Sequence, residues 1–279
     1  MSTPLTACSG IRMPPLLYGT AWKEARTAAL VEMALTLGFR GIDTACQPKH
    51  YHEAGVGQGI AAALTTGIKR SDLYVQTKYT PLRGQDPKRI PYDPGAPLDV
   101  QVVQSFQRSL ENLQTHYIDG LVLHSPLADP GQLKAVWQAM ESLVEQGGVK
   151  QLGISNCYHP AQFKQLWQMA DVKPAVLQNR FYADSGYDVE LRAFCDAHGV
   201  IYQSFWSLTA NPRILGHEVV TALCKRYQRT APQIFFRYLN QLGILPLIGT
   251  TSAEHMRQDL AIFEFALRGA ECQAIGELF

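Results

Sequence analysis

Eight short runs of strand-forming residues, each followed by a segment with helical spacing, are the feature that most limits what this chain can fold into. Apolar, β-branched and aromatic residues concentrate in these runs, whereas the intervening segments repeat apolar residues every three or four positions. Alternation of this kind is typical of βαβ units around a parallel sheet. The runs lie at residues 16–20, 40–45, 72–79, 118–125, 149–155, 175–181, 200–206 and 243–249.

The number of runs favours a closed barrel over an open, doubly wound sheet. A dinucleotide-binding sheet of the open type carries Gly-x-Gly-x-x-Gly directly after its first strand, and no such motif follows residues 16–20. A TIM barrel consists of eight strand–helix units, and a chain of this length forms one such barrel as a single domain. We therefore predict an α/β fold, a (β/α)8 TIM barrel, as a single domain over residues 1–279.

Composition excludes several classes of partner. The 25 Lys and Arg residues nearly balance the 24 Asp and Glu residues, so the net charge attracts neither nucleic acid nor an anionic membrane. The N-terminal segment lacks the basic start and apolar centre of a signal peptide, and no apolar run is long enough to span a membrane. We expect a soluble, cytoplasmic protein that binds a small molecule. No pattern predicts its oligomeric state.

The cysteines predict neither disulfides nor a metal site. They are far apart, without a Cys-x-x-Cys pair and without histidines at zinc-binding spacing. We expect buried free thiols at Cys8, Cys46, Cys157, Cys195, Cys224 and Cys272.

Polar residues stand at the ends of several predicted strands. Asp43, Lys78 and His124 end the second, third and fourth runs, and barrel enzymes carry their active sites at these ends. Singly, such residues have structural explanations, since a strand-end aspartate often caps the next helix. Together with Tyr51 they suggest proton chemistry, because a nearby ammonium group stabilises a phenolate and lowers a tyrosine pKa from about 10.

One long irregular segment, residues 80–98, follows the third run and contains five prolines. Barrels carry functional loops at this point, so the segment is either a lid or pocket wall or a plain insertion.

Five segments, GFRGIDTA, VQTKY, IDGLVLHSP, LGISN and AVLQNRF, resemble in order the strand ends of the aldo-keto reductases. The resemblance implies hydride transfer from the nicotinamide of NADPH to an aldehyde or ketone, or the reverse alcohol oxidation, with a tyrosine donating the proton. In that scheme Lys78 lowers the pKa of Tyr51, Asp43 holds Lys78, and His124 orients the carbonyl group.

The resemblance also implies cofactor and substrate contacts. Ser155, Asn156 and Gln178 would bind the nicotinamide carboxamide, and Phe205 would stack on its ring in place of the usual tyrosine. Substrate would meet Trp22, His50 and Trp206. The predicted cofactor-binding residues are Thr20, Ser155, Asn156, Gln178, Phe205, Trp206, Leu208, Gly249, Thr250, Ser252, His255, Gln258 and Asp259.

The loop that should carry the catalytic tyrosine departs from the family pattern. Pro48 occupies the usual tyrosine position, and alignment backward from Glu53 places His50 there, with Tyr51 one residue later. We predict Tyr51 as the proton donor. His50, with a reference pKa near 6.5, is the alternative.

A second departure follows the eighth run. Gly249 and His255 stand where the family carries Lys and Arg for the adenosine 2′-phosphate, which weakens the implied preference for NADP. Thr250, Ser252, Arg257 and the start of a helix near residues 252–254 remain as phosphate ligands. We predict NADPH, with NADH as the alternative.

The departures leave two further hypotheses open. One is an NADPH-binding barrel with little catalysis, acting as a redox sensor or regulatory subunit. The other is a reductase specialised for one biosynthetic carbonyl compound. Many family members also continue into a closing C-terminal loop, whereas this chain ends at Phe279 after one short predicted helix, so we expect a more open pocket.

Overall fold

Eight parallel strands close into a barrel in the computed structural model, which describes residues 4–279. Each predicted run contains one strand, and β10 pairs with β3 to close the ring, with Leu247 opposite Leu17. The (β/α)8 prediction is therefore confirmed. The strands are β3 (Leu17–Gly19), β4 (Gly41–Asp43), β5 (Tyr74–Tyr79), β6 (Gly120–Leu123), β7 (Leu152–Ser155), β8 (Val176–Arg180), β9 (Ile201–Phe205) and β10 (Leu245–Ile248).

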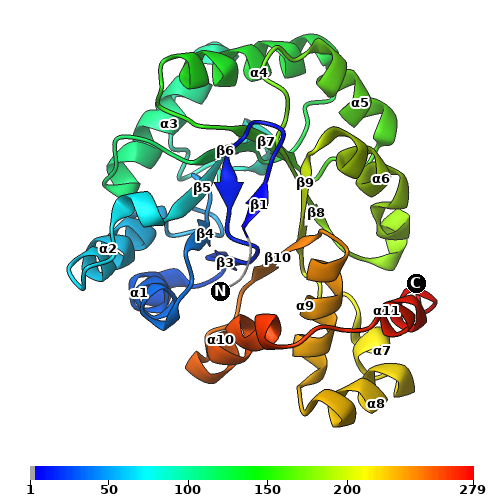
Figure 1. Ribbon diagram of the computed structural model, residues 1–279. Coiled ribbons are helices and arrows are strands. Elements are labelled where there is room, and N and C mark those ends of the chain that lie inside the picture. The colour runs from blue at the N-terminus through cyan, green and yellow to red at the C-terminus, as the bar shows by residue number, and fades with distance from the viewer. Residues whose placement is uncertain (1–3) are drawn as a thin grey trace.

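Helices surround the barrel (Figure 1) and bury their apolar faces against it. Their starts follow local sequence signals: Asp129 caps α4 by accepting from the Gln132 amide, Thr230 and Gln233 form a capping box at α9, and Ser252 caps α10. The α-helices are α1 (Thr27–Leu37), α2 (Glu53–Leu64), α3 (Leu98–Leu113), α4 (Pro130–Glu145), α5 (Pro160–Met169), α6 (Val189–His198), α7 (Pro212–Leu215), α8 (Glu218–Tyr227), α9 (Ala231–Gln241), α10 (Ala253–Leu260) and α11 (Gly269–Gly276). Short 3-10 turns are η1 (Glu24–Arg26), η2 (Arg70–Asp72), η3 (Leu82–Gly84), η4 (Ala183–Asp188) and η5 (Ala261–Glu264).

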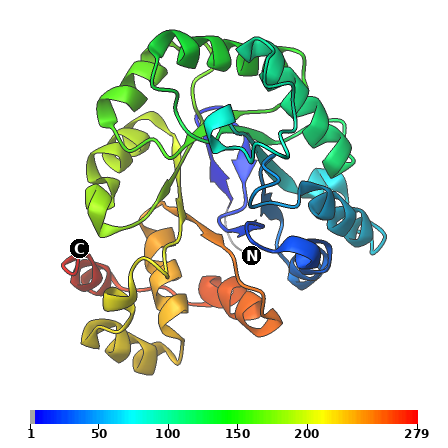
Figure 2. The same cartoon turned by 180° about the vertical axis from the view of Figure 1, so that it is seen from behind.

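An N-terminal hairpin, which the sequence did not predict, lies across the end of the barrel where the strands begin (Figures 1 and 2). Its strands, β1 (Leu5–Thr6) and β2 (Arg12–Met13), are antiparallel and only two residues long. Met13 is fully buried, in a cluster with the inward-facing Leu17, Val176 and Leu245. The hairpin therefore covers the end of the barrel at which the strands begin.

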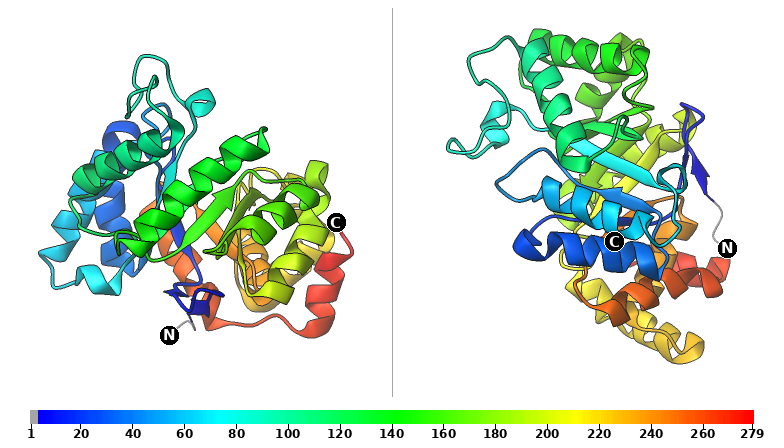
Figure 3. Two further views of the ribbon diagram at one scale, coloured as in Figure 1. Left: turned by 90° about the horizontal axis from the view of Figure 1, so that it is seen from above. Right: turned by 90° about the vertical axis from the view of Figure 1, so that its left-hand side faces the viewer.

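The irregular segment at residues 80–98 projects from the opposite end, as the right-hand view of Figure 3 shows. Two of its side chains anchor it to the end of β5: the Tyr92 hydroxyl donates to the Thr80 carbonyl at 2.8 Å, and Gln85 Nε2 donates to the same oxygen at 3.1 Å. The segment therefore stands on the side of the barrel where the strands end.

The cysteines are free, as predicted, but only three of them are buried. Cys46, Cys157 and Cys195 lie in the interior, whereas Cys8 is exposed in the turn of the hairpin. Cys224 on α8 and Cys272 on α11 are partly exposed. Among residues 4–279, no helix has both the length and the apolar character needed to cross a membrane.

Candidate active site

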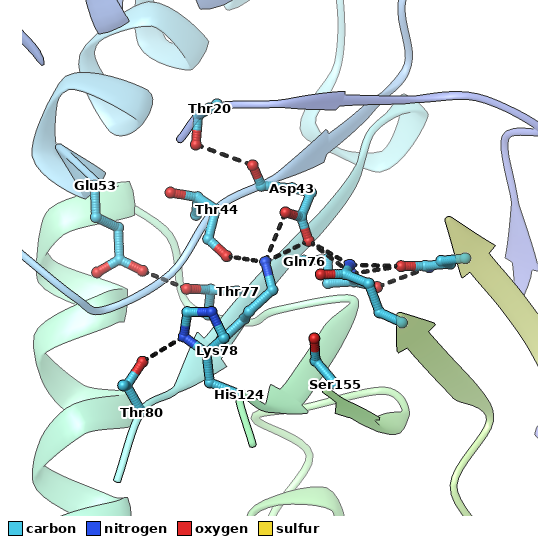
Figure 4. Close-up of polar contacts among 12 residues, drawn as sticks. Thr20, Asp43, Thr44, Glu53, Gln76, Thr77, Lys78, Thr80, His124 and Ser155 are labelled. Atoms are coloured by element: carbon cyan, nitrogen blue, oxygen red, sulfur yellow. Dashed lines mark hydrogen bonds and ion pairs between the residues drawn. The ribbon is translucent and has the colours of Figure 1, made fainter. Parts of the chain in front are cut away.

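Three neighbouring strands bring Asp43, Lys78 and His124 together at one end of the barrel (Figure 4). Lys78 Nζ donates to both carboxylate oxygens of Asp43, at 2.7 and 2.6 Å, and to the Thr44 carbonyl at 2.9 Å. Lys78 is 1% exposed and Asp43 2%. An ammonium group has three protons, so these three acceptors use all of them.

The environment of Lys78 combines burial with negative charge. Burial lowers the pKa of Lys78 below its usual value, and the negative charges of Asp43 and Glu53 oppose this effect. Glu53 is itself buried in α2, where it accepts hydrogen bonds from Thr77, Ser109 and Asn112. The ion pair between Lys78 and Asp43 therefore lies in a low-dielectric interior, where each of its two charges acts strongly on nearby groups.

Tyr51, rather than His50, lies against this ion pair. The centre of the Tyr51 ring is 5.4 Å from Lys78 Nζ and 5.9 Å from the centre of the His124 ring. The His50 ring instead lies against Trp22, tilted by 34° with 3.9 Å between ring centres. The lengthened loop folds back in a turn, because the amides of His50 and Tyr51 both donate to the Gln47 carbonyl.

The electrostatic effect on Tyr51 differs from the expectation. Burial and the negative charge of Asp43 raise the pKa of Tyr51 above that of a free phenol. Lys78 does not offset this by a hydrogen bond, because its protons are donated to Asp43 and Thr44 and its charge faces the Tyr51 ring. On balance the pKa of Tyr51 is therefore raised, the opposite of the net lowering expected from Lys78.

His124 is a neutral imidazole held by a residue that the sequence reasoning missed. Burial and the positive charges of Lys78 and His50 lower the pKa of His124 to about 3. Its Nδ1 is 2.6 Å from the Thr80 hydroxyl oxygen, so Nε2 is the nitrogen left to meet a substrate. Thr80 follows Lys78 by two positions, directly after the end of β5, and this period-two spacing was the available signal.

The residues expected to bind the nicotinamide lie beside the ion pair. Ser155 pairs in register with Gln178, whose Nε2 donates to Asp43 Oδ1 at 3.0 Å. Asn156 Nδ2 donates to the His124 carbonyl at 2.8 Å. Thr20 is fully buried, and its hydroxyl donates to the Asp43 carbonyl at 2.9 Å.

Aromatic side chains surround the open end of the site. Trp22 is 59% exposed and Trp206 is 52% exposed, so both present ring surface to solvent. Trp206 follows Phe205 at the end of β9, and its ring lies 4.1 Å from the Arg180 guanidinium carbon. Leu208, by contrast, is partly buried against the hydrophobic core.

The residues predicted to bind a cofactor phosphate lie between β10 and α10. Thr250 Oγ1 accepts from the Ser252 amide, and its distance to His255 Nδ1 is 3.4 Å. Lys23 extends from the loop after β3 and donates to the Gly249 carbonyl. A Cβ atom built on Gly249 would lie 3.7 Å from Lys23 Nζ. The two remaining predicted residues are on α10: Gln258 bonds to Glu254, and Asp259 is buried.

A family model described as "Aldo/keto reductase family" matches residues 17–278 of the chain. The chain belongs to the aldo/keto reductase family. It is therefore an NAD(P)H-dependent oxidoreductase of carbonyl and alcohol groups, as the resemblance implied.

Curated relatives match along nearly the whole chain. "Aldo-keto reductase family 1 member A1" of Xenopus tropicalis is 28% identical, over 98% of this chain and 88% of that protein. "Glyoxal reductase" of Bacillus subtilis is 27% identical, over 97% of this chain and 90% of that protein.

Solved structures agree. A Brucella melitensis aldo/keto reductase superposes with a TM-score of 0.84 at 25% identity, covering 100% of both chains. A Bombyx mori aldo-keto reductase in complex with NADP gives a TM-score of 0.82 at 25% identity, covering 99% of this chain and 92% of that one.

Proposed function

We propose that this aldo/keto reductase uses NADPH to reduce aldehydes or ketones, with Tyr51 as the proton donor. The observation that carries the proposal is the position of the Tyr51 ring, which contacts both Lys78 and His124. His50 is the less suitable donor because its ring lies against Trp22. Burial and Lys49 also lower the pKa of His50, so at neutral pH it holds no proton that it can lose easily.

His124 and Tyr51 have separate roles in the proposed reduction. A nicotinamide dinucleotide, when bound, supplies the hydride. The neutral His124 orients the substrate oxygen through Nε2, and Tyr51 donates its phenolic proton to that oxygen as negative charge develops there. An alkoxide is a stronger base than a phenolate, so even a phenol with a raised pKa completes the transfer. Because Tyr51 stays protonated, the arrangement favours reduction over alcohol oxidation.

The side chains of the site have the chemical groups needed to bind a nicotinamide dinucleotide. Trp206 and Phe205 offer aromatic surface, and both hydrogen bonds of the Gln178 side chain within residues 4–279 use Nε2, which leaves Oε1 to accept from a carboxamide. Lys23 carries an ammonium group to Gly249, where the family lysine is missing. This substitute charge supports NADPH over NADH.

The proton donor is tested by comparing Tyr51→Phe with His50→Gln. We expect Tyr51→Phe to lower kcat by at least about a hundredfold, the contribution of a positioned acid, and to leave NADPH binding, measured by tryptophan fluorescence, within about twofold. His50→Gln should change kcat little. A large loss of kcat in His50→Gln with retained turnover in Tyr51→Phe would reassign the acid.

The cofactor preference is tested by Lys23→Met. Removing the ammonium group should weaken binding of NADPH by about tenfold or more, because a charged hydrogen bond contributes about 1.5–3 kcal/mol. Binding of NADH should weaken less. Equal losses for both cofactors would mean that Lys23 does not contact the 2′-phosphate.

Trp22 and His50 form an aromatic wall that suits a hydrophobic carbonyl substrate. The alternative of a cofactor-binding barrel with little catalysis is not favoured, since an ion pair, a neutral histidine and a tyrosine all lie in contact. We also propose that the enzyme acts in the cytoplasm on a small molecule.

A further inference from the structure

Buried polar side chains occupy the middle of this barrel, where TIM barrels ordinarily pack branched apolar side chains. Side chains alternate along a strand, so Tyr74, Gln76 and Lys78 of β5 all point into the barrel. Gln76 is fully buried, and so is Gln203, which enters from β9. Neither glutamine has a place in the chemistry described above.

The two glutamines form a hydrogen-bonded group with Asp43. Asp43 Oδ1 accepts from Gln76 Nε2 at 2.8 Å and from Gln178 Nε2 at 3.0 Å. Gln203 Oε1 accepts from the same two nitrogens, at 2.9 and 2.8 Å. Gln203 Nε2 donates back to Gln76 Oε1 at 3.1 Å. The amide dipoles are thereby locked with their N–H groups toward the carboxylate.

The hydrogen bonds continue from Gln76 to the far end of the barrel. The Tyr74 hydroxyl donates to Gln76 Oε1 at 3.0 Å, and Gln151 Nε2 donates to the Tyr74 hydroxyl at 2.8 Å. The Ser9 hydroxyl, in the turn of the hairpin, donates to Gln151 Oε1 at 2.6 Å. Every donor in this chain points toward Asp43, so each bond polarises the next in the same sense.

Gly120 provides an independent indication that the chain is a built feature. A Cβ atom on Gly120 would lie 2.4 Å from the Tyr74 hydroxyl oxygen and 3.3 Å from Gln76 Oε1. Real Cβ atoms do not approach so closely, and the two neighbours are buried. The absence of a side chain on β6 at this level leaves room for the contact between Tyr74 and Gln76.

We propose that Gln76 and Gln203 are positioning residues that hold Asp43 as a carboxylate and thereby keep Lys78 an ammonium ion beside Tyr51. A buried pair of this kind has two forms, the ion pair and a neutral pair in which one proton has moved from Lys78 Nζ to an Asp43 oxygen. N–H donors stabilise the charged carboxylate more than the neutral acid. In a low-dielectric interior their effect on this balance is large. The inference rests on the proposed function, because only the ammonium form stabilises a phenolate.

Several groups face the pair and enter its balance. Lys78 contacts Asp43 and faces the ring of Tyr51, and the His124 ring lies against Tyr51 from the end of β6. Glu53 acts on Lys78 from α2. Tyr74, four residues before Lys78 on β5, carries no charge at neutral pH, since burial raises its pKa. Of these groups, Gln76 hydrogen-bonds only to Asp43 and Tyr74, whereas Gln203 bonds to Gln76 and Gln178 and so acts on Asp43 through them.

The test compares Gln76→Leu, which removes the amide at similar size, with Gln101→Leu. Gln101 is also buried and hydrogen-bonded, but it lies on α3 outside the barrel. The pH profile of alcohol oxidation reports the phenolate form of Tyr51. In Gln76→Leu its rising limb should move up by about one pH unit, the scale of one lost hydrogen bond to a charge. Gln101→Leu should leave the limb in place.

A second variant separates charge from packing. In Gln76→Glu the new carboxyl group can donate to Asp43 only while it is protonated. Activity should therefore fall as pH rises through the titration of that group, and Gln76→Leu should show no such fall. Equal profiles for the two variants, both matching the wild-type limb, would overturn the proposal.

A measurement without turnover distinguishes this inference from the proposed function. Carbon NMR of protein labelled at the aspartate carboxyl groups follows Asp43 directly, with its signal assigned by loss in Asp43→Asn. In wild type the signal should stay at the carboxylate position at neutral pH, and in Gln76→Leu it should move toward the protonated position. Inactive wild type would refute the reductase, whereas an unmoved signal in Gln76→Leu would refute the role of the glutamine.

Discussion

Replacing Asp43 by asparagine should destabilise the protein more than replacing Lys78 by methionine, although each change breaks the same ion pair. The reason is what remains around the surviving partner. In Asp43→Asn the ammonium group, 1% exposed, keeps the Thr44 carbonyl but faces an uncharged amide. In Lys78→Met the carboxylate keeps the N–H groups of Gln76 and Gln178.

The magnitudes follow from this asymmetry. Leaving a buried charge without its partner costs about 3–5 kcal/mol, which we expect for Asp43→Asn. For Lys78→Met the loss should be nearer one charge-assisted hydrogen bond, about 1.5–3 kcal/mol. In a chain of this size each kcal/mol lowers Tm by about 2–4 °C. The two variants should therefore be distinguishable by several degrees.

Urea unfolding at pH 7, followed by tryptophan fluorescence, measures the difference as a shift in midpoint at constant slope. Asp119→Asn is a matched control, because Asp119 is 6% exposed while its partners Arg70 and Lys150 are 18% and 43% exposed. Partners that reach water can be hydrated, so this change should cost less than Asp43→Asn. Equal or greater destabilisation by Lys78→Met than by Asp43→Asn would refute the reasoning.

Three further predictions concern buried groups. Because the folded protein lowers the pKa of His124 to about 3, the unfolded chain binds a proton at this residue first as the pH falls. The free energy of unfolding should therefore decrease between about pH 6.5 and pH 3. In His124→Gln this decrease, measured by denaturation at each pH, should be smaller. Burial raises the pKa of Asp259 to about 7, so the free energy of unfolding should decrease as the pH rises from about 4 to 7. Asp259→Asn should therefore be more stable than wild type at pH 8 but not at pH 4. An equal gain at both pH values would refute this. Gly120→Ala should lower stability by about 1–3 kcal/mol through overpacking against Tyr74, and the double variant with Tyr74→Phe should recover part of the loss in thermal denaturation.

The sequence was sufficient to predict the barrel and the positions of its eight strands, because apolar runs and strand-end polar residues are local patterns. It was not sufficient for the hairpin, since strands of two residues leave no periodic signal and are held by packing beneath the barrel. The cysteines show the same limit, because the exposure of Cys8 depends on that hairpin.

Within the site, the strand residues were easier to predict than their electrostatics. Asp43, Lys78 and His124 follow from strand order alone. The orientation of Tyr51 depends on the turn at Gln47, and the effect of Lys78 depends on which acceptors take its protons. Gln76 was overlooked because a polar residue between Val75 and Thr77 gives no sign of facing inward unless Tyr74 and Lys78 are considered with it.

The hairpin has a consequence for the hydration of the barrel. The polar middle of the barrel is separated from bulk water on the lower side by Met13 and the apolar layer around it, and Ser9 is the first hydroxyl beyond. If that layer were opened, solvent molecules would compete for the acceptors on Gln151, Gln76 and finally Asp43. The exclusion of water from the Asp43 carboxylate therefore depends on residues at the end of the barrel opposite the proposed substrate site.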